Sequence, residues 1–289
     1  MSFDQLALQL LTGLQIGAIY VLVALGLTLI FGTLGVANFA HGALYMLGAY
    51  AGLVVSAQLG WLWAALLVPL GMFVVGILFD RGLLQFFYKR PVTDQILVTF
   101  GLAIILQELA RTMFGGTTKP FPAPSWARIP VDIGIGFYPP WRLVIIAVTV
   151  LVVAALFILL RYTRFGLMVR AGMRDPEMVR YLGIDATRLF TLVVGLGAAL
   201  AGVAGIMGGP AYSVEPGSGM ALLVPSFLVV VIGGMGSLVG AVIAGLLMGL
   251  TVSFSVITVP AISQVIIYIV AVVVLTLRPR GLFGLEGVG

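Results

Sequence analysis

Long stretches without charge dominate the pattern of hydrophobic and polar positions along this chain. No Asp, Glu, Lys or Arg occurs from Gln5 to Phe79 or from Pro216 to Leu277. A bilayer core of about 30 Å is crossed by roughly 20 helical residues, so this pattern predicts membrane-spanning helices. The clear spans on this measure are Gln9 to Phe31, Leu34 to Ser56, Trp61 to Phe79, Gln95 to Phe114, Leu143 to Leu160, Leu189 to Met207 and Ala261 to Leu277.

The stretch from Ala221 to Ile257 is too long for one untilted helix, and it carries Gly233, Gly234 and Gly236 near its middle. Lys and Arg are enriched in cytoplasmic loops, which places residues 161–188 and the basic carboxyl-terminal tail on the same side of the membrane. An even number of crossings must therefore separate them. We expect a short helix running inward, a glycine-rich turn and a longer helix running back out. Their expected bounds are Leu222 to Ile232, Gly233 to Ser237 and Leu238 to Ile257.

These elements predict an all-α integral membrane protein, a polytopic helical bundle of about eight helical segments in one domain over residues 1–289. Counting back three spans from the basic loop that starts at Arg81 puts the amino terminus outside. The same count makes residues 161–188 a cytoplasmic loop and residues 115–141 an external one. With eight full crossings the two ends would instead share a side, so the depth of the short helix decides the amino-terminal side.

Composition narrows the class of protein further. The chain is 61% hydrophobic and 9% charged, whereas soluble proteins carry roughly 25% charged residues. Its pI near 9.7 comes from arginines that flank apolar segments, and nucleic-acid binding would need a basic face on a soluble fold. The chain has no cysteine, which excludes disulfides and cysteine metal sites. Neither a Ser-His-Asp set nor a metal-ligand cluster is visible, so an enzyme is not expected.

Glycine interrupts the apolar pattern in corresponding places of the two halves. Gly32 and Gly35 precede a new helix near His41, much as Gly233 and Gly236 precede one at Leu238. Irregular backbone at membrane depth is tolerated only where it is buried or lines a cavity, so two broken helices indicate a transport path. The alternative is that small residues merely allow close helix packing. The predicted path residues are Asn38, His41, Gly42, Gly233, Gly234 and Ser237.

Few ionisable groups lie inside the apolar segments. His41 is the only histidine, and the reading we favour is a hydrogen bond to a backbone carbonyl freed by the helix break, with a proton relay as the alternative. Glu108 and Arg111 are three residues apart, a spacing at which an ion pair neutralises itself, so a structural pair is favoured over a coupling-ion site.

The external loop over residues 115–141 holds six of the fourteen prolines and two of the four tryptophans. Such a segment cannot form a long helix, and tryptophan is typical of the headgroup boundary. A docking surface for an external partner and a plain interfacial linker are equally consistent with it.

The segment from Arg161 to Arg188 holds six of the thirteen arginines and three of the ten acids. We call residues 161–188 the polar island. Asp175 is suited to cap the amino terminus of a short helix, Pro176 to its first position and Glu177 to its first turn. Gly183 is suited to a left-handed carboxyl-terminal cap, and Asp185 to the start of the next helix.

A helix over Pro176 to Leu182 is too short to be stable alone, so we expect it to dock on a partner. An ordinary positive-inside loop is the alternative. The residues expected to couple to that partner are Arg174, Asp175, Pro176, Glu177, Met178, Leu182, Gly183 and Asp185.

Four strings in this sequence resemble those of a known family. They are GVANFAHG at 35–42, RPV at 90–92, LGID at 182–185 and GGMGS at 233–237. Together they resemble the branched-chain amino acid ABC transporter permeases of the LivH type, and the resemblance runs from Gly13 to Gly284 in the family order. The tract at 38–42 looks more like LivH than like its LivM relative.

This resemblance implies a type II-like ABC importer permease in the bacterial inner membrane. It implies a second, LivM-like permease subunit, two cytoplasmic ABC ATPases and a periplasmic substrate-binding protein as partners, with the polar island carrying the helix that seats in an ATPase. Relatives handle branched-chain and other amino acids, amides, urea and aromatic acids. No cofactor is expected on the chain itself, because ATP and Mg²⁺ would be bound by the partner subunits.

One observation from the residues agrees with this. A P-loop requires Gly-x-x-x-x-Gly-Lys-Ser/Thr, but the two lysines, Lys89 and Lys119, are followed by Arg90 and Pro120. Active transport would therefore need energy from a separate subunit. An ion-coupled secondary transporter and a passive small-solute channel remain as alternatives; the first would need intramembrane ionisable groups.

Overall fold

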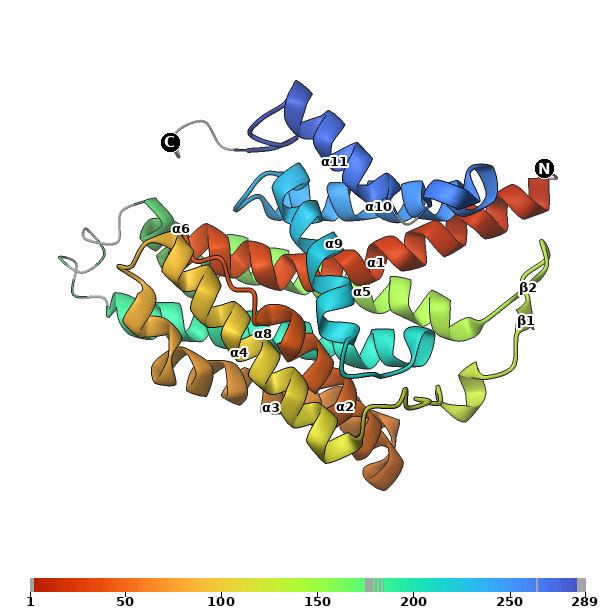
Figure 1. The fold of residues 1–289 in the computed structure, drawn as a ribbon, viewed down its shortest axis with the longest axis horizontal. Coiled ribbons are helices and arrows are strands. Elements are labelled where there is room, and N and C mark those ends of the chain that lie inside the picture. The colour runs from red at the N-terminus through yellow and green to blue at the C-terminus, as the bar shows by residue number, and fades with distance from the viewer. Residues whose placement is uncertain are drawn as a thin grey trace.

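The computed structural model describes residues 3–174, 179, 181, 183, 185–263 and 265–284. The described chain is a bundle of helices with one small hairpin (Figure 1). The helices are α1 (Phe3–Leu34), α2 (His41–Leu59), α3 (Trp61–Gly82), α4 (Val92–Phe114), α5 (Pro140–Tyr162), α6 (Arg164–Arg174), α8 (Ala186–Tyr212), α9 (Ser218–Gly233), α10 (Leu238–Thr258) and α11 (Ile266–Leu277). Among the described residues, 7 helices are long and apolar enough to cross a membrane.

Helices α1 and α8 form the centre of the bundle. Their most apolar windows are 83% and 78% buried, against 17% to 22% for α3, α4 and α5. The neighbours approach α8 closely because glycine leaves room for them: a Cβ on Gly76 of α3 would lie 2.6 Å from the Ala198 Cβ. On the other side of the bundle, a Cβ on Gly249 of α10 would lie 2.2 Å from the Gly17 nitrogen of α1. Small residues thus let backbones pack directly, as is typical of membrane helices.

The connection between α4 and α5 folds back on the bundle through aromatic side chains. It contains the 3-10 helix η2 (Ser125–Ala127) and a hairpin of β1 (Val131–Asp132) and β2 (Phe137–Tyr138). The Trp61 ring stacks on Phe121 at 5.0 Å and tilts against Trp141 at 4.7 Å. Trp141 Nε1 donates a hydrogen bond of 3.1 Å to the Met207 carbonyl of α8. Phe121 and Trp141 therefore hold the connection between α4 and α5 against the helices.

Figure 1 shows the amino terminus and the hairpin at one end of the bundle and α6 at the other. A Cβ on Gly136 of the hairpin would lie 3.2 Å from Leu8 of α1, so the hairpin contacts the first turns of α1. The amino terminus therefore lies at the end of the bundle opposite α6, and the side of the membrane that it faces stays a prediction.

The two segments expected between residues 221 and 257 are confirmed as α9 and α10. Three expectations are wrong in detail. The span expected from Leu34 begins only at His41, because residues 35–40 are not helical. The last span is only 12 residues long, since a 3-10 helix η3 (Pro260–Ile262) occupies its expected start.

The third error is that α6 was not expected. One side of α6 is apolar: Val169 is buried there, in a cluster that includes Leu160 and Leu189, and Phe165 and Met168 pack against this cluster. Helix α6 therefore lies against the end of α5 and the start of α8.

Candidate functional site: two helix breaks joined by α9

The first helix break lies between α1 and α2 and is buried. Gly35 has a φ of +66°, a left-handed conformation that glycine adopts without strain. The backbone beyond it is held by side chains: Ala40 N donates to Asn38 Oδ1 at 3.0 Å, and Phe39 N donates to Thr99 Oγ1 of α4 at 3.1 Å. The Phe39 ring packs 5.4 Å from that of Phe227 in α9. Both α4 and α9 thus contact the break.

His41, the first residue of α2, is 0% exposed. Its ring fits the notch that Gly26 leaves in α1, since a Cβ on Gly26 would lie 2.6 Å from His41 Cε1. Neither ring nitrogen has a regular hydrogen bond among the described residues, although the ring interacts with the Val23 backbone at poorer geometry. That contact is with the continuous part of α1 rather than with a carbonyl freed by the break. The imidazole is packed between helices in this conformation.

Gly42 brings α2 against the start of α9. A Cβ on Gly42 would lie 2.4 Å from the Gly219 oxygen, and one on Gly219 would lie 2.5 Å from the Gly42 oxygen. The two helices therefore touch backbone to backbone at this point. Any larger residue at either position must separate them.

The second break joins α9 to α10. Gly234 and Gly236 have φ values of +100° and +84°, and Ser237 caps α10 by accepting a 3.1 Å hydrogen bond from Gly240 N. The carboxyl-terminal tail covers this turn, since Leu282 N donates to the Ile232 oxygen at 2.7 Å and Phe283 N to the Gly233 oxygen at 3.1 Å. These two bonds satisfy carbonyls that the end of α9 would leave free.

The predicted path residues therefore form two groups rather than one. Gly42 lies against the start of α9, with Asn38 and His41 just before it in the chain, and Gly233, Gly234 and Ser237 lie at the other end of α9. Helix α9 has 16 residues, which is about 24 Å at 1.5 Å per residue. Figure 1 shows α9 crossing α1 and α10 rather than running alongside them. A single helix thus connects the two breaks.

Part of the polar island can be described. Gly183 has a φ of +77°, the left-handed conformation expected for it. Asp185 caps α8 as expected: its Oδ1 accepts a 3.1 Å hydrogen bond from Arg188 N, and its Oδ2 lies 2.9 Å from Arg188 Nε. Arg174 is the last residue of α6. Asp175, Pro176, Glu177, Met178 and Leu182 lie outside the described residues, so the expected helix and its docking role stay predictions.

The carboxyl-terminal end of α3 carries a buried acid that sequence reasoning missed. Asp80 is 0% exposed, and its Oδ2 accepts a 2.6 Å hydrogen bond from Thr191 Oγ1 of α8. Its Oδ1 accepts from the Tyr88 hydroxyl. Burial and this hydrogen bond raise the pKa of the Tyr88 phenol, so the hydroxyl stays protonated and donates. The only signal in the sequence was an acid at the end of an otherwise uncharged span.

The other ionisable pair expected in a span is exposed. Arg111 Nη1 lies 3.7 Å from Glu108 Oε2, with side chains 63% and 64% exposed. Within the described part of the chain, no group of three or more His, Cys, Asp or Glu residues could hold a metal ion.

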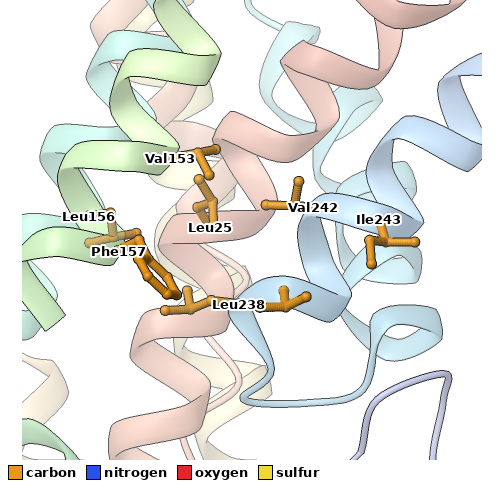
Figure 2. A pocket seen from close by; sticks show the side chains of 8 residues that line it. Leu25, Val153, Leu156, Phe157, Leu238, Val242 and Ile243 are labelled. Carbon is orange, nitrogen blue, oxygen red and sulfur yellow. The ribbon is translucent and has the colours of Figure 1, made fainter. Parts of the chain in front are cut away.

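A groove of about 140 Å³ opens between α1, α5 and α10. Figure 2 shows Leu25, Val153, Leu156, Phe157, Leu238, Val242 and Ile243 around it. All of its lining side chains are apolar, so it is suited to hydrocarbon and offers nothing to hold the charged groups of an amino acid.

Comparison with known proteins decides the family. A family model described as "Branched-chain amino acid transport system / permease component" matches residues 9–275. The chain belongs to this permease family. It is 31% identical to the high-affinity branched-chain amino acid transport system permease protein LivH of Escherichia coli K12, over 96% of this chain and 94% of the relative. It is 29% identical to BraD of Pseudomonas aeruginosa, over 96% and 95%.

A probable branched-chain amino acid transport permease protein LivH of Methanocaldococcus jannaschii is 31% identical, over 92% of this permease and 89% of the relative. Among solved structures, PsaBC from Streptococcus pneumoniae in complex with Fab aligns with a TM-score of 0.47 and 15% identity, covering 96% of this chain and 91% of that one.

These findings make the chain a transport subunit rather than an enzyme, embedded in the inner membrane by its apolar helices. A permease component of an ABC system works with further subunits of that system. The LivH-type resemblance expected from the strings at 35–42 and 233–237 is confirmed.

Proposed function

We propose that this permease moves branched-chain amino acids, or a related small amphipathic solute, into the cytoplasm by alternating access. The observation that carries the proposal is α9, a helix with a glycine contact or glycine turn at each end. Gly42 and Gly219 let α9 contact α2 without side chains between them, and Gly234 and Gly236 let the chain reverse into α10. Such ends can act as hinges, because a few residues absorb the change in backbone angles while the helix stays intact.

The energy comes from two cytoplasmic ATPases that bind ATP and Mg²⁺. The chain has no P-loop of its own, since neither lysine stands in the required context. In this proposal the polar island seats in an ATPase, with Asp175, Pro176, Glu177, Met178 and Leu182 forming the docked helix. Gly183 and Asp185 then fix the angle at which the loop joins α8.

The remaining partners are a second, LivM-like permease and a periplasmic substrate-binding protein. The buried share of α3, α4 and α5 is low, so these helices are free to face lipid or the second permease. The solute itself is supported by the names of the relatives, which are branched-chain amino acid permeases. Because the helix breaks carry no charged side chain, the binding protein supplies most of the selectivity.

Uptake by proteoliposomes tests this proposal. The permease is reconstituted with the second permease and the ATPases, and the binding protein is added outside with labelled leucine, glutamine, urea or phenylalanine. We expect accumulation of leucine that requires both the binding protein and ATP, and that stops with a non-hydrolysable ATP analogue. Uptake driven by an ion gradient without the ATPases would instead establish a secondary transporter, and flux without any energy source a channel. Accumulation of another solute alone would replace leucine as the substrate.

A further inference from the structure

Among the described residues, Asp80 is a buried acid held by hydrogen bonds rather than by an ion pair. Its relative exposure is 0%, and no ion pair of the described residues includes it. Arg81, the next residue, is exposed and lies at the end of α3. Burying a charged group is costly unless hydrogen bonds satisfy it, and hydroxyls satisfy both oxygens of Asp80. The hydrogen bonds to both oxygens therefore stabilise Asp80 in its buried position.

The two hydroxyls come from separate parts of the chain. Tyr88 belongs to the connection between α3 and α4, and Thr191 lies in α8, six residues after the cap at Asp185. The Phe190 ring also meets the Tyr88 ring edge-on at 5.9 Å. Asp80 thus joins α3, the α3–α4 connection and the first turns of α8. Those first turns are the part of α8 that leaves the polar island directly.

The same two helices remain in direct contact beyond Asp80. A Cβ on Gly76 would lie 2.9 Å from the Gly195 Cα, and one on Gly202 would lie 2.8 Å from Met72 Cγ. The contact therefore extends over about two turns of α3, and the two backbones approach each other closely at Gly76. Packing this tight resists sliding of one helix past the other, so α3 and α8 are suited to move as one body.

We propose that Asp80 is a positioning residue that transmits movement from the polar island to the transmembrane helices. This inference rests on the proposed ATP-driven transport. A displacement applied at Asp185 can either fray the first turns of α8 or carry α3 along with α8. By holding Thr191 and Tyr88, Asp80 selects the second outcome. Without it, ATP hydrolysis continues but less of the movement reaches α3.

The test measures solute transported per ATP hydrolysed in the reconstituted complex. Asp80→Ala removes the acceptor, and Thr191→Val and Tyr88→Phe each remove one donor. Since conformational coupling is typically about 5- to 150-fold, we expect Asp80→Ala to lower the ratio at least about fivefold while ATPase activity and assembly persist. Asp80→Asn, which keeps one acceptor oxygen, should lower it less. Asp94→Ala, at the start of α4 and at the same end of the bundle, is the matched control and should not change it.

Several results would overturn the inference. One is an unchanged ratio in Asp80→Ala, and another is a fall in uptake and ATPase activity in equal proportion, which would mean a merely structural role. If Asp80→Ala does not assemble, Thr191→Val and Tyr88→Phe decide the question, because each removes a single hydroxyl. Failure of the proposed function is distinguishable, since the unmodified complex would then show no ATP-dependent uptake.

A covalent link between α3 and α8 tests directly whether the two helices move as one body. The chain has no cysteine, so Asp80→Cys with Thr191→Cys can be linked selectively by a short bifunctional methanethiosulfonate. We expect the unlinked double variant to have a low ratio and the linked one to regain it. Loss of uptake upon linking would mean that α3 and α8 must separate during transport, which contradicts the inference.

Discussion

Gly42 and Gly219 hold α2 and α9 at backbone contact, with each glycine occupying the space in which the other's Cβ would lie. Adding a methyl group to Gly42 would place it 2.4 Å from the Gly219 oxygen. Overpacking of this kind costs about 1–3 kcal/mol. We therefore expect Gly42→Ala and Gly219→Ala each to reduce uptake severalfold and to lower the thermal unfolding midpoint of the purified protein.

Gly71 of α3 and Gly101 of α4 are matched controls, because no atom lies within 4 Å of a Cβ built at either position. Alanine there should neither reduce uptake nor lower the unfolding midpoint, because alanine favours a helix more than glycine does. Equal losses at all four glycines would mean that the contact between α2 and α9 does not explain the result.

The helices that cross the membrane could be predicted from the sequence because their length and apolar character follow from the thickness of the bilayer. The start of α2 could not be predicted from the sequence. Residues 36–40 are nearly as apolar as the helices beside them, and they stay non-helical because Asn38 and Thr99 accept hydrogen bonds from their backbone. Thr99 lies in another helix, so this cause is not visible locally.

In the candidate site too, local features could be predicted from the sequence and long-range contacts could not. Each glycine break was evident from its own residues, as were the left-handed Gly183 and the cap at Asp185. The link between the breaks through α9 depends on the contact of Gly42 with Gly219, far apart in sequence. Asp80 was missed for the same reason, since Thr191 is 111 residues away.

Backbone strain at Gly183 provides a test of the polar island. Its φ of +77° costs a non-glycine residue about 1–2 kcal/mol, so Gly183→Val should displace the loop and abolish uptake while the assembled protein remains in the membrane. Asp175→Lys should do the same by removing the predicted helix cap. Both variants are compared by uptake and by the amount of ATPase retained on the purified permease.

Gly115→Val is the control for strain alone. Gly115 has a φ of +84° and open space around it, but it follows the end of α4 and lies outside the polar island. We expect the Gly115→Val permease to keep its ATPase subunits. Normal uptake in both Gly183→Val and Asp175→Lys would remove the coupling role of the island.

Substitution of His41 tests whether protons take part in transport. Its ring is fully buried against Gly26, a position that suits packing better than proton exchange with water. We expect His41→Gln to retain ATP-driven uptake with the same pH profile between about pH 5.5 and 8, the range over which an ordinary histidine titrates. Gly26→Ala, which leaves the histidine but fills its notch, should impair uptake more. A pH profile that changes only in His41→Gln would favour the proton relay.

The carboxyl-terminal tail is expected to stabilise the turn between α9 and α10. Leu282 and Phe283 donate backbone hydrogen bonds to the last carbonyls of α9, and a buried carbonyl left without a donor costs about 1–3 kcal/mol. Ending the chain after Arg280 should therefore lower the thermal unfolding midpoint and reduce uptake. Ending it after Gly284 retains both hydrogen bonds and serves as the control. If the two truncations unfold at the same temperature, the tail does not stabilise the turn, and the reversal from α9 to α10 depends on Gly234, Gly236 and the Ser237 cap alone.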